Sequence, residues 1–219
     1  MLEHNFWHKL KRGPQIITVK DAAMIAGMTG LQSGDHVIDA GAGSGYLAVY
    51  LGSVVAPNGR VATYENRGEF ADLAKKNIAR AGLDKIVELK EKNAFEGFDE
   101  KDVDLVTLDM AESEKVLKHA KAAVKHNGWI VGYIPNVEQV SKFVMEAESL
   151  KLKVERVTEF YLRDWKIRPY GSRPENQAMV FTAFLVFLRK ITESDFDRER
   201  EENTKENRRD RRIRHKLRA

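Results

Sequence analysis

The stretch His36-Val-Ile-Asp-Ala-Gly-Ala-Gly-Ser-Gly-Tyr46 decides the fold that this sequence predicts. It begins with a short apolar run typical of a buried parallel strand, which opens directly into Gly41, Gly43 and Gly45. Glycine lets the backbone turn with positive φ and approach a ligand closely, and a predicted helix at residues 46–55 points its N-terminal amides into the same gap. The pattern therefore predicts a small molecule bound against the main chain.

The spacing of these glycines excludes two common nucleotide-binding turns. Asp39-x-Gly-x-Gly-x-Gly differs from the Gly-x-Gly-x-x-Gly of dinucleotide folds, and the Lys and Ser/Thr of a phosphate-binding loop are missing. Roughly 20 residues after the glycines, a predicted strand at 60–65 ends in Glu65, where a doubly wound sheet can present a carboxylate to both ribose hydroxyls. This arrangement favours an adenosine group; a glycine turn in another kind of α/β protein is the alternative.

Apolar runs and helical patterns alternate along the rest of the chain. We expect strands at 37–40, 60–65, 85–90, 103–109 and 128–134, helices at 22–28, 46–55, 67–81, 113–125 and 137–150, and two long segments at 153–162 and 179–189. Asp21 is the expected cap of the first helix. Alternation at these intervals predicts a parallel sheet with right-handed crossovers, and the last segment, apolar on both faces, is expected to be a central strand.

Composition bounds the class of protein. A chain of 219 residues with 42% hydrophobic side chains suits one domain, and the lack of cysteine excludes disulfides, thiolate catalysis and cysteine-based metal sites. No apolar signal region and no run of ~18 apolar residues is present, so we expect a soluble, cytoplasmic protein with no membrane partner and no metal.

Positive charge gathers at the C-terminal end. The net charge is +4, and eight Lys or Arg residues stand against two acids in the last stretch: 205, 208, 209, 211, 212, 214, 216 and 218 against 206 and 210. We divide the chain into an N-terminal preamble and helix (1–30), a catalytic domain (31–190) and a basic tail (191–219). The tail is interpreted either as a solvated end or as a phosphate contact.

Three motifs resemble those of one enzyme family: the glycine turn with strand-terminal Glu65, the preamble Arg12-Gly-Pro-Gln-Ile-Ile-Thr-Val-Lys-Asp21, and the segment from Arg173 to Phe184. The first resembles methyltransferases of the doubly wound class that use S-adenosyl-L-methionine. Together they resemble the archaeal type of the tRNA (adenine-N1)-methyltransferases that modify T-loop adenosines. The resemblance implies a Rossmann-like, seven-stranded, mostly parallel sheet with the last strand antiparallel, S-adenosylmethionine as cofactor and tRNA as partner.

The resemblance also implies the reaction, which is methylation of N1 of adenosine 58, with adenosine 57 as a second candidate. It implies a homotetramer. Members of the family usually carry an additional β-rich N-terminal domain, whereas about a dozen residues precede the preamble here. We expect the basic tail to replace the grip on tRNA that this domain supplies.

The cofactor contacts that the resemblance implies follow the strand ends. Gln15 would lie near the methionine end, and Asn93 stands where related enzymes commonly have Asp, although its carbonyl oxygen can still accept a hydrogen bond. A surface position for Gln15 and a turn-forming role for Asn93 are the alternatives. The full set is Gln15, Asp39, Gly41, Gly43, Ser44, Gly45, Glu65, Asn66, Asn93, Ala94 and Asp109.

Asp109 is the candidate catalytic residue. It ends the predicted strand at 103–109, on the same carboxyl edge as Asp39 and Glu65. A carboxylate that accepts a hydrogen bond from the exocyclic amine makes adenine N1 a better nucleophile and offsets the positive charge of the product. The family usually continues Asp-x-Pro, and here Ala111 replaces the proline. Capping of the helix expected near Ser113 is the alternative role.

Residues 163–177 interleave cations with aromatic rings, which is what an extruded RNA base requires. We interpret them as a long loop without structure of its own, a kind of segment that tends to be functional; a solvated connector is the alternative. The family's Gly-His-Thr is Val180-Phe181-Thr182 here, without the histidine. Asn136 is expected to cap the following helix. The implied substrate contacts are Tyr133, Trp165, Arg168, Tyr170, Arg173 and Thr182.

Two other functions stay open at this point. The same fold transfers methyl groups to protein carboxylates or small ring compounds in other enzymes, because fold does not settle substrate. The departures at Asn93, Ala111 and Phe181 also suggest a non-catalytic RNA-binding subunit. An intact set of glycines with Glu65 argues against that reading.

Overall fold

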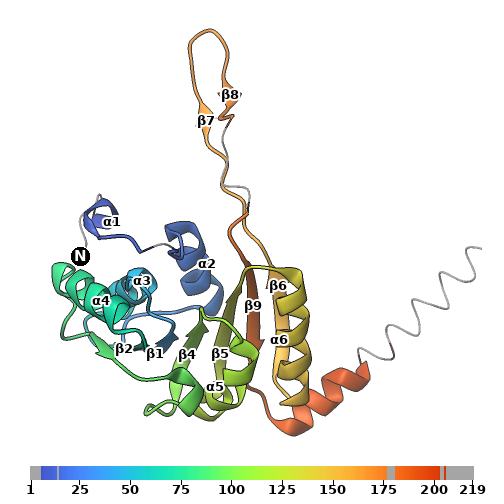
Figure 1. Ribbon diagram of the computed structural model, residues 1–219. Helices are drawn as coiled ribbons and strands as arrows, with labels where there is room; N and C mark the ends of the chain where they lie inside the picture. The colour runs from blue at the N-terminus through green and yellow to red at the C-terminus, as the bar shows by residue number, and fades with distance from the viewer. Residues whose placement is uncertain (1–5, 14, 177–180, 203–204, 206–219) are drawn as a thin grey trace, which may run out of the picture.

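The computed structural model describes residues 6–13, 15–176, 181–202 and 205. Residues 203, 204 and 206–219 of the predicted basic tail, and residues 177–180 of the Arg173-to-Phe184 motif, lie outside the described residues. A seven-stranded sheet of order β3-β2-β1-β4-β5-β9-β6 forms the centre (Figure 1). Its strands are β1 (His36–Ala40), β2 (Arg60–Tyr64), β3 (Val87–Lys90), β4 (Val103–Leu108), β5 (Val124–Ile134), β6 (Lys153–Thr158) and β9 (Phe184–Arg189).

The strand directions confirm the predicted fold class. Strands β1 to β5 pair in parallel along the sheet, and β9 lies antiparallel between β5 and β6. The apolar last segment is therefore a central strand, as predicted, because both of its faces are covered. In the register, Ala40 lies opposite both Tyr64 and Leu108. The residues that follow, Gly41, Glu65 and Asp109, consequently emerge at one level of the carboxyl edge.

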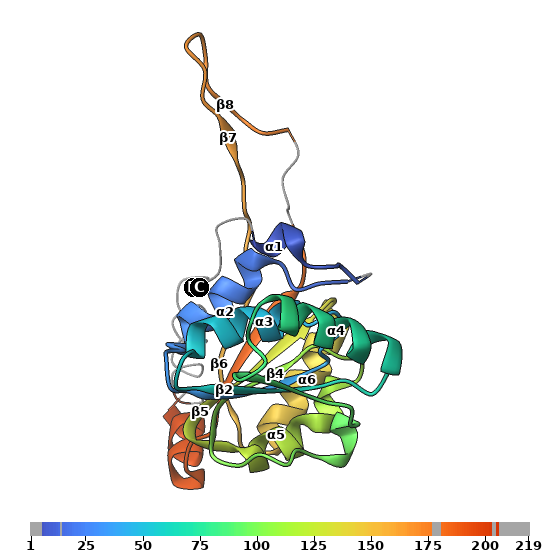
Figure 2. The ribbon, with the colours of Figure 1, turned by 90° about the vertical axis from the view of Figure 1, so that its left-hand side faces the viewer.

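Helices cover both faces of the sheet (Figure 2). One face carries α2 (Val19–Thr29), α3 (Tyr46–Val55) and α4 (Gly68–Arg80), and α1 (Phe6–Lys9) packs on α3 through Trp7. The other face carries α5 (Leu117–Ala123) and α6 (Val137–Ser149). Each face has its own apolar cluster, with Ile25, Leu47 and Ile78 in the first and Leu117 and Phe143 in the second. This burial fixes the sheet and so holds the carboxyl-edge loops in place.

Two local predictions about helices are wrong, and a third is confirmed. Asp21 does not cap a helix, because α2 begins at Val19 after Thr18 and the Asp21 carboxylate is buried inside the first turn. The helix expected at 113–125 is a short 3₁₀ helix, η2 (Ser113–Val116), followed by α5, and the chain is already extended from Val124. Asn136 does cap α6, since its side chain accepts from the Gln139 N–H at 2.9 Å.

The loop expected at 163–177 is in fact an antiparallel ribbon. Strands β7 (Trp165–Lys166) and β8 (Arg173–Pro174) pair, and Lys166 forms an ion pair with Glu175 at 2.6 Å. Figures 1 and 2 show the ribbon projecting away from the body of the molecule. Because β6 and β5 both run antiparallel to β9, the ribbon leaves the sheet at the carboxyl edge of the parallel strands.

Candidate active site

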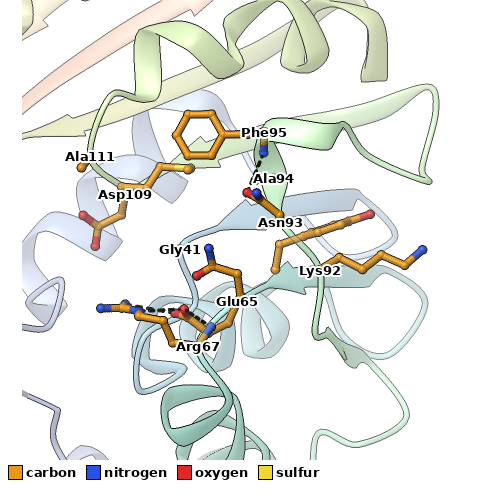
Figure 3. Close-up of a pocket in the computed structure, with 12 residues that line it drawn as sticks. Gly41, Glu65, Arg67, Lys92, Asn93, Ala94, Phe95, Asp109 and Ala111 are labelled. Carbon is orange, nitrogen blue, oxygen red and sulfur yellow. Dashed lines mark hydrogen bonds and ion pairs between the residues drawn. The ribbon is translucent and has the colours of Figure 1, made fainter.

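The carboxyl ends of β1 to β4 enclose a pocket of about 250 Å³ (Figure 3). Six of the predicted cofactor contacts line it, namely Gly41, Glu65, Asn66, Asn93, Ala94 and Asp109. Sequence reasoning missed the other lining residues, which are Tyr64, Arg67, Lys92, Phe95, Met110 and Ala111. Their only signal in the sequence is that each stands within three residues of a predicted contact at a strand end.

The glycine turn is held against the end of β2. The Gly41 and Ala42 N–H groups both donate to the Tyr64 carbonyl at 3.0 Å. Gly41 has φ +97°, and a Cβ added there would lie 2.0 Å from the Asp109 carbonyl oxygen, so glycine is required for both reasons. Gly45 precedes α3 as its N-cap. The backbone of the turn and the residue after β4 are therefore in direct contact.

Glu65 is buried and held ionised by its donors. Its Oε1 accepts from the Arg67 N–H at 3.1 Å and from Arg67 Nε at 3.0 Å, while Oε2 accepts from the Gly43 N–H at 2.9 Å and from Arg67 Nη2 at 3.3 Å. Burial by itself would raise the pKa of the Glu65 carboxyl, but the hydrogen bonds from Arg67 and Gly43 outweigh it and lower that pKa. The side chain is thus an ionised acceptor whose lone pairs are engaged by Arg67 and Gly43.

Asp39 does not line the pocket. It is 1% exposed and accepts from Thr63 Oγ1 at 2.7 Å and from Thr107 Oγ1 at 2.8 Å, which ties β1 to its neighbours β2 and β4. Burial raises the pKa of the Asp39 carboxyl above its ordinary value, in opposition to these two hydrogen bonds. Asp39 therefore holds the strands together beneath the glycine turn. Its negative charge also raises the pKa of the Asp109 carboxyl.

Asp109 borders the pocket on the opposite side from Asn93 in the view of Figure 3. Its N–H donates to the Ala40 carbonyl at 2.9 Å, which fixes the start of the loop after β4. Burial and, to a smaller extent, the negative charge of Asp39 raise the pKa of the Asp109 carboxyl to about 7. The residue before η2 is Glu112, so the alternative role of Asp109 as a cap of that helix is not the one observed.

Asn93 combines the two roles that its position allowed. Its side-chain oxygen accepts from the Phe95 N–H at 3.1 Å, which caps the short 3₁₀ helix η1 (Ala94–Glu96), as a turn-forming residue does. The same side chain also borders the pocket, next to Lys92 and Phe95 (Figure 3). Asn93 therefore both caps η1 and forms part of the pocket wall.

The residue just before the preamble, Lys11, is linked to the glycine turn through Asn77 of α4, which sequence reasoning missed. Asn77 is fully buried, exchanges hydrogen bonds with the Lys11 backbone at 2.9 and 3.0 Å, and donates to the Ser44 carbonyl at 2.8 Å. Ser44 is buried, whereas Gln15 is exposed and is not among the residues that line the pocket. An asparagine on the apolar face of α4, beside Ala74 and Ile78, was the available signal.

A second polar cluster joins two predicted substrate contacts, Tyr133 and Thr182, to the end of the preamble. Asp21 is fully buried, and its carboxylate accepts from Lys20 Nζ at 2.6 Å, from Thr182 Oγ1 at 2.8 Å and from the Tyr133 hydroxyl at 3.4 Å. Burial first, and then the charge of Asp21 with a smaller effect from Asp109, raise the pKa of the Tyr133 phenol. The cluster therefore lies within electrostatic reach of Asp109.

The other predicted substrate contacts stand apart from both groups. Trp165, Arg168, Tyr170 and Arg173 all lie on the projecting ribbon, and all four are exposed. Trp165 is 59% exposed, and the Tyr170 ring has no cover from the protein. Arg173 donates to Asn176 Oδ1 at 2.7 Å. The structure thus groups the predicted residues into a pocket, a buried polar cluster and a ribbon.

Two kinds of feature are missing from the described part of the chain. Among those residues, no helix combines the length and the apolar character needed to cross a membrane. Within the same ranges, no three His, Cys, Asp or Glu side chains are grouped so that they could hold a metal ion.

Comparison with known proteins gives a consistent result. Residues 4–218 match the family described as the tRNA methyltransferase complex GCD14 subunit. The tRNA (adenine(57)-N(1)/adenine(58)-N(1))-methyltransferase TrmI of Methanocaldococcus jannaschii is 32% identical over 92% of this chain and 81% of its own length. The tRNA (m1A58) methyltransferase TrmI of Aquifex aeolicus has a TM-score of 0.79 at 27% identity, over 86% of this chain and 75% of that one. A SAM-dependent O-methyltransferase of Thermotoga maritima has a TM-score of 0.81 at 34% identity, over 84% and 69%.

Proposed function

The chain belongs to the family of the tRNA methyltransferase complex GCD14 subunit, and from this premise we propose that it methylates N1 of an adenosine in the T-loop of tRNA. The target is adenosine 58, with adenosine 57 as a second, as the name of the archaeal relative has it. The methyl donor is S-adenosyl-L-methionine. One observation carries the proposal: Glu65 and Asp109 emerge at the same level of one pocket with pKa values shifted in opposite directions.

The residues of the pocket fit the proposed cofactor. Gly41 has no room for a side chain beside the Asp109 carbonyl, so a ligand there meets backbone, and Glu65 offers an ionised carboxylate suited to ribose hydroxyls. We assign the adenine to the wall formed by Asn93, Ala94 and Phe95, and the methionine portion to the glycine turn. When bound, S-adenosylmethionine supplies an electrophilic methyl group on a positively charged sulfur.

Asp109 performs the chemistry that this chain contributes to the acceptor. As a carboxylate it accepts a hydrogen bond from the exocyclic amine of adenine, which raises electron density at N1. The N1 lone pair forms the new bond to the methyl carbon as the carbon–sulfur bond breaks. The electron pair of that bond stays on sulfur, which becomes a neutral thioether, and the methylated ring is cationic. The negative charge of Asp109, held in a partly buried site, offsets that positive charge in the transition state.

The ribbon of β7 and β8 is our candidate contact for the tRNA. N1 of the target adenine is tied up in the folded tRNA, so the base has to leave its stack before it can react. Trp165 and Tyr170 offer exposed rings for stacking, and Arg168 and Arg173 offer cations for phosphates. The ribbon leaves the same edge of the sheet as the pocket, which puts both on one side of the molecule.

The proposal has four further features. We propose a cytoplasmic location, because the proposed substrate is a tRNA. The homotetramer remains a proposal, and so does the division of the chain at residues 30 and 190. We also propose that residues 191–219 contribute phosphate contacts, since eight of their cations fall after residue 204.

The deciding experiment is nucleoside mapping. Purified protein is incubated with methyl-labelled S-adenosylmethionine and an unmodified tRNA transcript, and the RNA is digested to nucleosides. We expect labelled 1-methyladenosine, lost when position 58 is guanosine and reduced when position 57 is guanosine. Asp109→Asn serves as the matched control and should leave cofactor binding intact. Label in another nucleoside, or none, would overturn the proposal.

Methyl transfer to an oxygen acceptor is the second candidate function. It is favoured by the Thermotoga maritima neighbour, which is described as an O-methyltransferase. The same incubation separates the two, because label would then appear in a base-labile ester or in a small-molecule ether and not in RNA. The exposed cations and rings of the ribbon favour the RNA acceptor.

A non-catalytic RNA-binding subunit, suggested by Asn93, Ala111 and Phe181, makes a different prediction. Such a subunit has no need to bind the methyl donor. Titration calorimetry with S-adenosylmethionine is the measurement, and we expect saturable binding that Glu65→Ala weakens by about tenfold or more, because two charge-assisted hydrogen bonds to ribose are lost.

A further inference from the structure

The Asp21 cluster joins three parts of the chain that are distant in sequence. Asp21 and Lys20 begin α2, Tyr133 stands near the end of β5, and Thr182 precedes β9. The Lys20 side chain is 10% exposed and donates both to Asp21 Oδ1 and, at 2.8 Å, to Thr182 Oγ1. Thr18 Oγ1 also donates to Asp21 Oδ2, at 3.0 Å. An ion pair and three hydroxyl groups therefore meet at one point, where Asp21 is buried and its partners are partly buried.

Folding stability does not account for this arrangement. Taking two opposite charges out of water costs about as much as their attraction returns, and apolar side chains of similar volume commonly replace such pairs without loss. The apolar neighbours of Asp21 in α2, Ala22 and Ile25, already bury the helix against the sheet. Buried charges of this kind concentrate at functional sites.

The cluster is adjacent to the proposed catalytic residue. Leu108 of β4 and Gly132 of β5 are register partners, so the next residues, Asp109 and Tyr133, are neighbours on adjacent strands. Neighbouring strands lie about 4.8 Å apart, which brings the two side chains to the same part of the carboxyl edge. The effect of the Asp109 charge on the pKa of Tyr133 has the same origin.

The donors and acceptors of the cluster fix the direction of each hydroxyl. An ammonium group only donates and a carboxylate only accepts, so Thr182 Oγ1, which receives a hydrogen from Lys20, gives its own hydrogen to Asp21. The Tyr133 hydroxyl likewise gives its single hydrogen to Asp21. With these hydrogens engaged, the Tyr133 oxygen has only lone pairs left for another partner.

From this, and resting on the proposed function, we propose that Asp21 and Lys20 are positioning residues that select the acceptor base. They hold the Tyr133 hydroxyl as a hydrogen-bond acceptor beside the Asp109 carboxylate. Adenine carries an amino group with two hydrogens next to N1, and one hydrogen can go to each oxygen. Guanine carries a carbonyl oxygen there, and two acceptors facing it leave it unpaired and repelled. The cluster therefore reads the amino group adjacent to the methylated nitrogen.

The test compares two tRNA transcripts that differ only at position 58, one with adenosine and one with purine riboside, which lacks the amino group. The ratio of their kcat/KM values measures how strongly the amino group is read. In Asp21→Asn the carboxamide can donate as well as accept, so the Tyr133 hydrogen is no longer held. We expect the ratio to fall by about fivefold or more, the worth of one hydrogen bond, with the affinity for S-adenosylmethionine unchanged.

Two further variants separate positioning from structure. Tyr133→Phe removes the acceptor and leaves the ion pair of Asp21 and Lys20 in place, so it should lower the ratio by a similar factor. Adding Asp21→Asn to Tyr133→Phe should then change the ratio no further. Asp84→Asn, the same chemical change at an exposed position on the amino side of β3, is the matched control and should leave the ratio unchanged.

Each outcome decides the matter. An unchanged ratio in Asp21→Asn or in Tyr133→Phe would overturn the inference while the proposed function stands. So would equal losses on both transcripts, because a structural defect lowers both alike. Where Asp21→Asn does not fold, Tyr133→Phe carries the test. If the unmodified enzyme makes no 1-methyladenosine at position 58, the proposed function falls, and this inference falls with it.

Discussion

Asp109 and Glu65 are both acids at strand ends, yet their surroundings act on them in opposite ways. Glu65 receives four hydrogen bonds, two of them from the guanidinium of Arg67, and its pKa is lowered in spite of burial. Burial and the charge of Asp39 instead raise the pKa of Asp109 to about 7. One carboxyl is thus ionised at all physiological pH values, and the other titrates close to neutrality.

The rate of methyl transfer should follow the ionisation of Asp109. Only the carboxylate accepts from the adenine amine and offsets the product charge, so we expect kcat/KM to rise with pH and to level off above a pKa of about 7. Initial rates between pH 5.5 and 9 check this. Cofactor affinity, measured in parallel, should vary little over the range. A flat profile would contradict the assigned role.

The same shift predicts how Asp109→Asn changes stability. The folded-state pKa lies above the value of 3.8 expected for the unfolded chain, so the folded protein binds the extra proton between pH 4 and 7. The stability contributed by protonated Asp109 is therefore complete below about pH 4 and is lost as pH rises through 7. Each pKa unit corresponds to about 1.4 kcal/mol, so Asp109→Asn should be more stable than the parent by a few kcal/mol at pH 8. Urea unfolding at pH 5 and pH 8 measures this, and a larger gain at pH 5 would refute it.

Arg67 competes with the ribose for Glu65. A carboxylate has about four acceptor positions, and Arg67 with Gly43 already fills four. The Arg67 side chain is 59% exposed, so its ion pair contributes at most about 1 kcal/mol. We therefore expect Arg67→Gln to bind S-adenosylmethionine as tightly as the parent or up to about fivefold more tightly, by calorimetry. Weaker binding would show that Arg67 contacts the cofactor directly.

The sequence predicts individual site residues correctly where their position follows from the pattern of strands. Glu65, Asn93 and Asp109 line the pocket because each follows an apolar run, and parallel strands end at one edge. It could not reach Lys20, whose partner Thr182 lies 162 residues away along the chain. Asp21 was predicted as a helix cap because local patterns contain no information on such distant partners.

Among the elements, the ribbon of β7 and β8 departs most from its prediction. Each strand has only two residues, and Pro169, Gly171 and Pro174 break any alternation that would have signalled them. The start of β5 was missed for a related reason. Asn127 has φ +61° and the residues around it are polar, so the apolar pattern resumes only at Gly128.

The ribbon should matter for tRNA and not for the cofactor. We expect Trp165→Ala combined with Tyr170→Ala to raise KM for tRNA by about tenfold or more, because stacking is worth about 1–3 kcal/mol per base. Cofactor affinity, measured by calorimetry, should not change, since the ribbon does not line the pocket. Met145→Ala, which removes an equally exposed apolar side chain from α6, is the control. An unaltered KM for tRNA would show that the ribbon does not bind tRNA and serves as a connector or as a contact between subunits.

At the scale of the whole molecule, the parallel sheet with helical crossovers followed from the alternation of elements, and the antiparallel last strand followed from the family resemblance. The three-part division of the chain stays a prediction. Leu10, just before the preamble, and Ile17 within it share an apolar cluster with Leu47 of α3. This part of the chain thus packs on the same face of the sheet as α3. The prediction set residues 1–30 apart from the catalytic domain because a break in the sequence pattern marks where a helix or strand ends. Such a break does not show where a shared hydrophobic core ends.

Electrostatics also belongs to the whole molecule. Binding that neutralises phosphates weakens with salt in proportion to the number of cations engaged. We expect removal of residues 205–219, with eight cations and two acids, to weaken tRNA binding and to flatten the dependence of log Kd on log salt. Filter binding from 50 to 300 mM KCl measures the slope. A truncated protein with the parental slope would mean that this segment stays in solvent.

The contact between Gly41 and the Asp109 carbonyl limits how this enzyme can be redesigned. A Cβ added at residue 41 would lie 2.0 Å from that oxygen, so no substitution of Gly41 can change the shape of the pocket without moving the backbone. Phe95 and Ala111, which also line the pocket, are more exposed and are free of that constraint. Engineers seeking to transfer larger alkyl groups from synthetic sulfonium donors should therefore begin their libraries at those two positions.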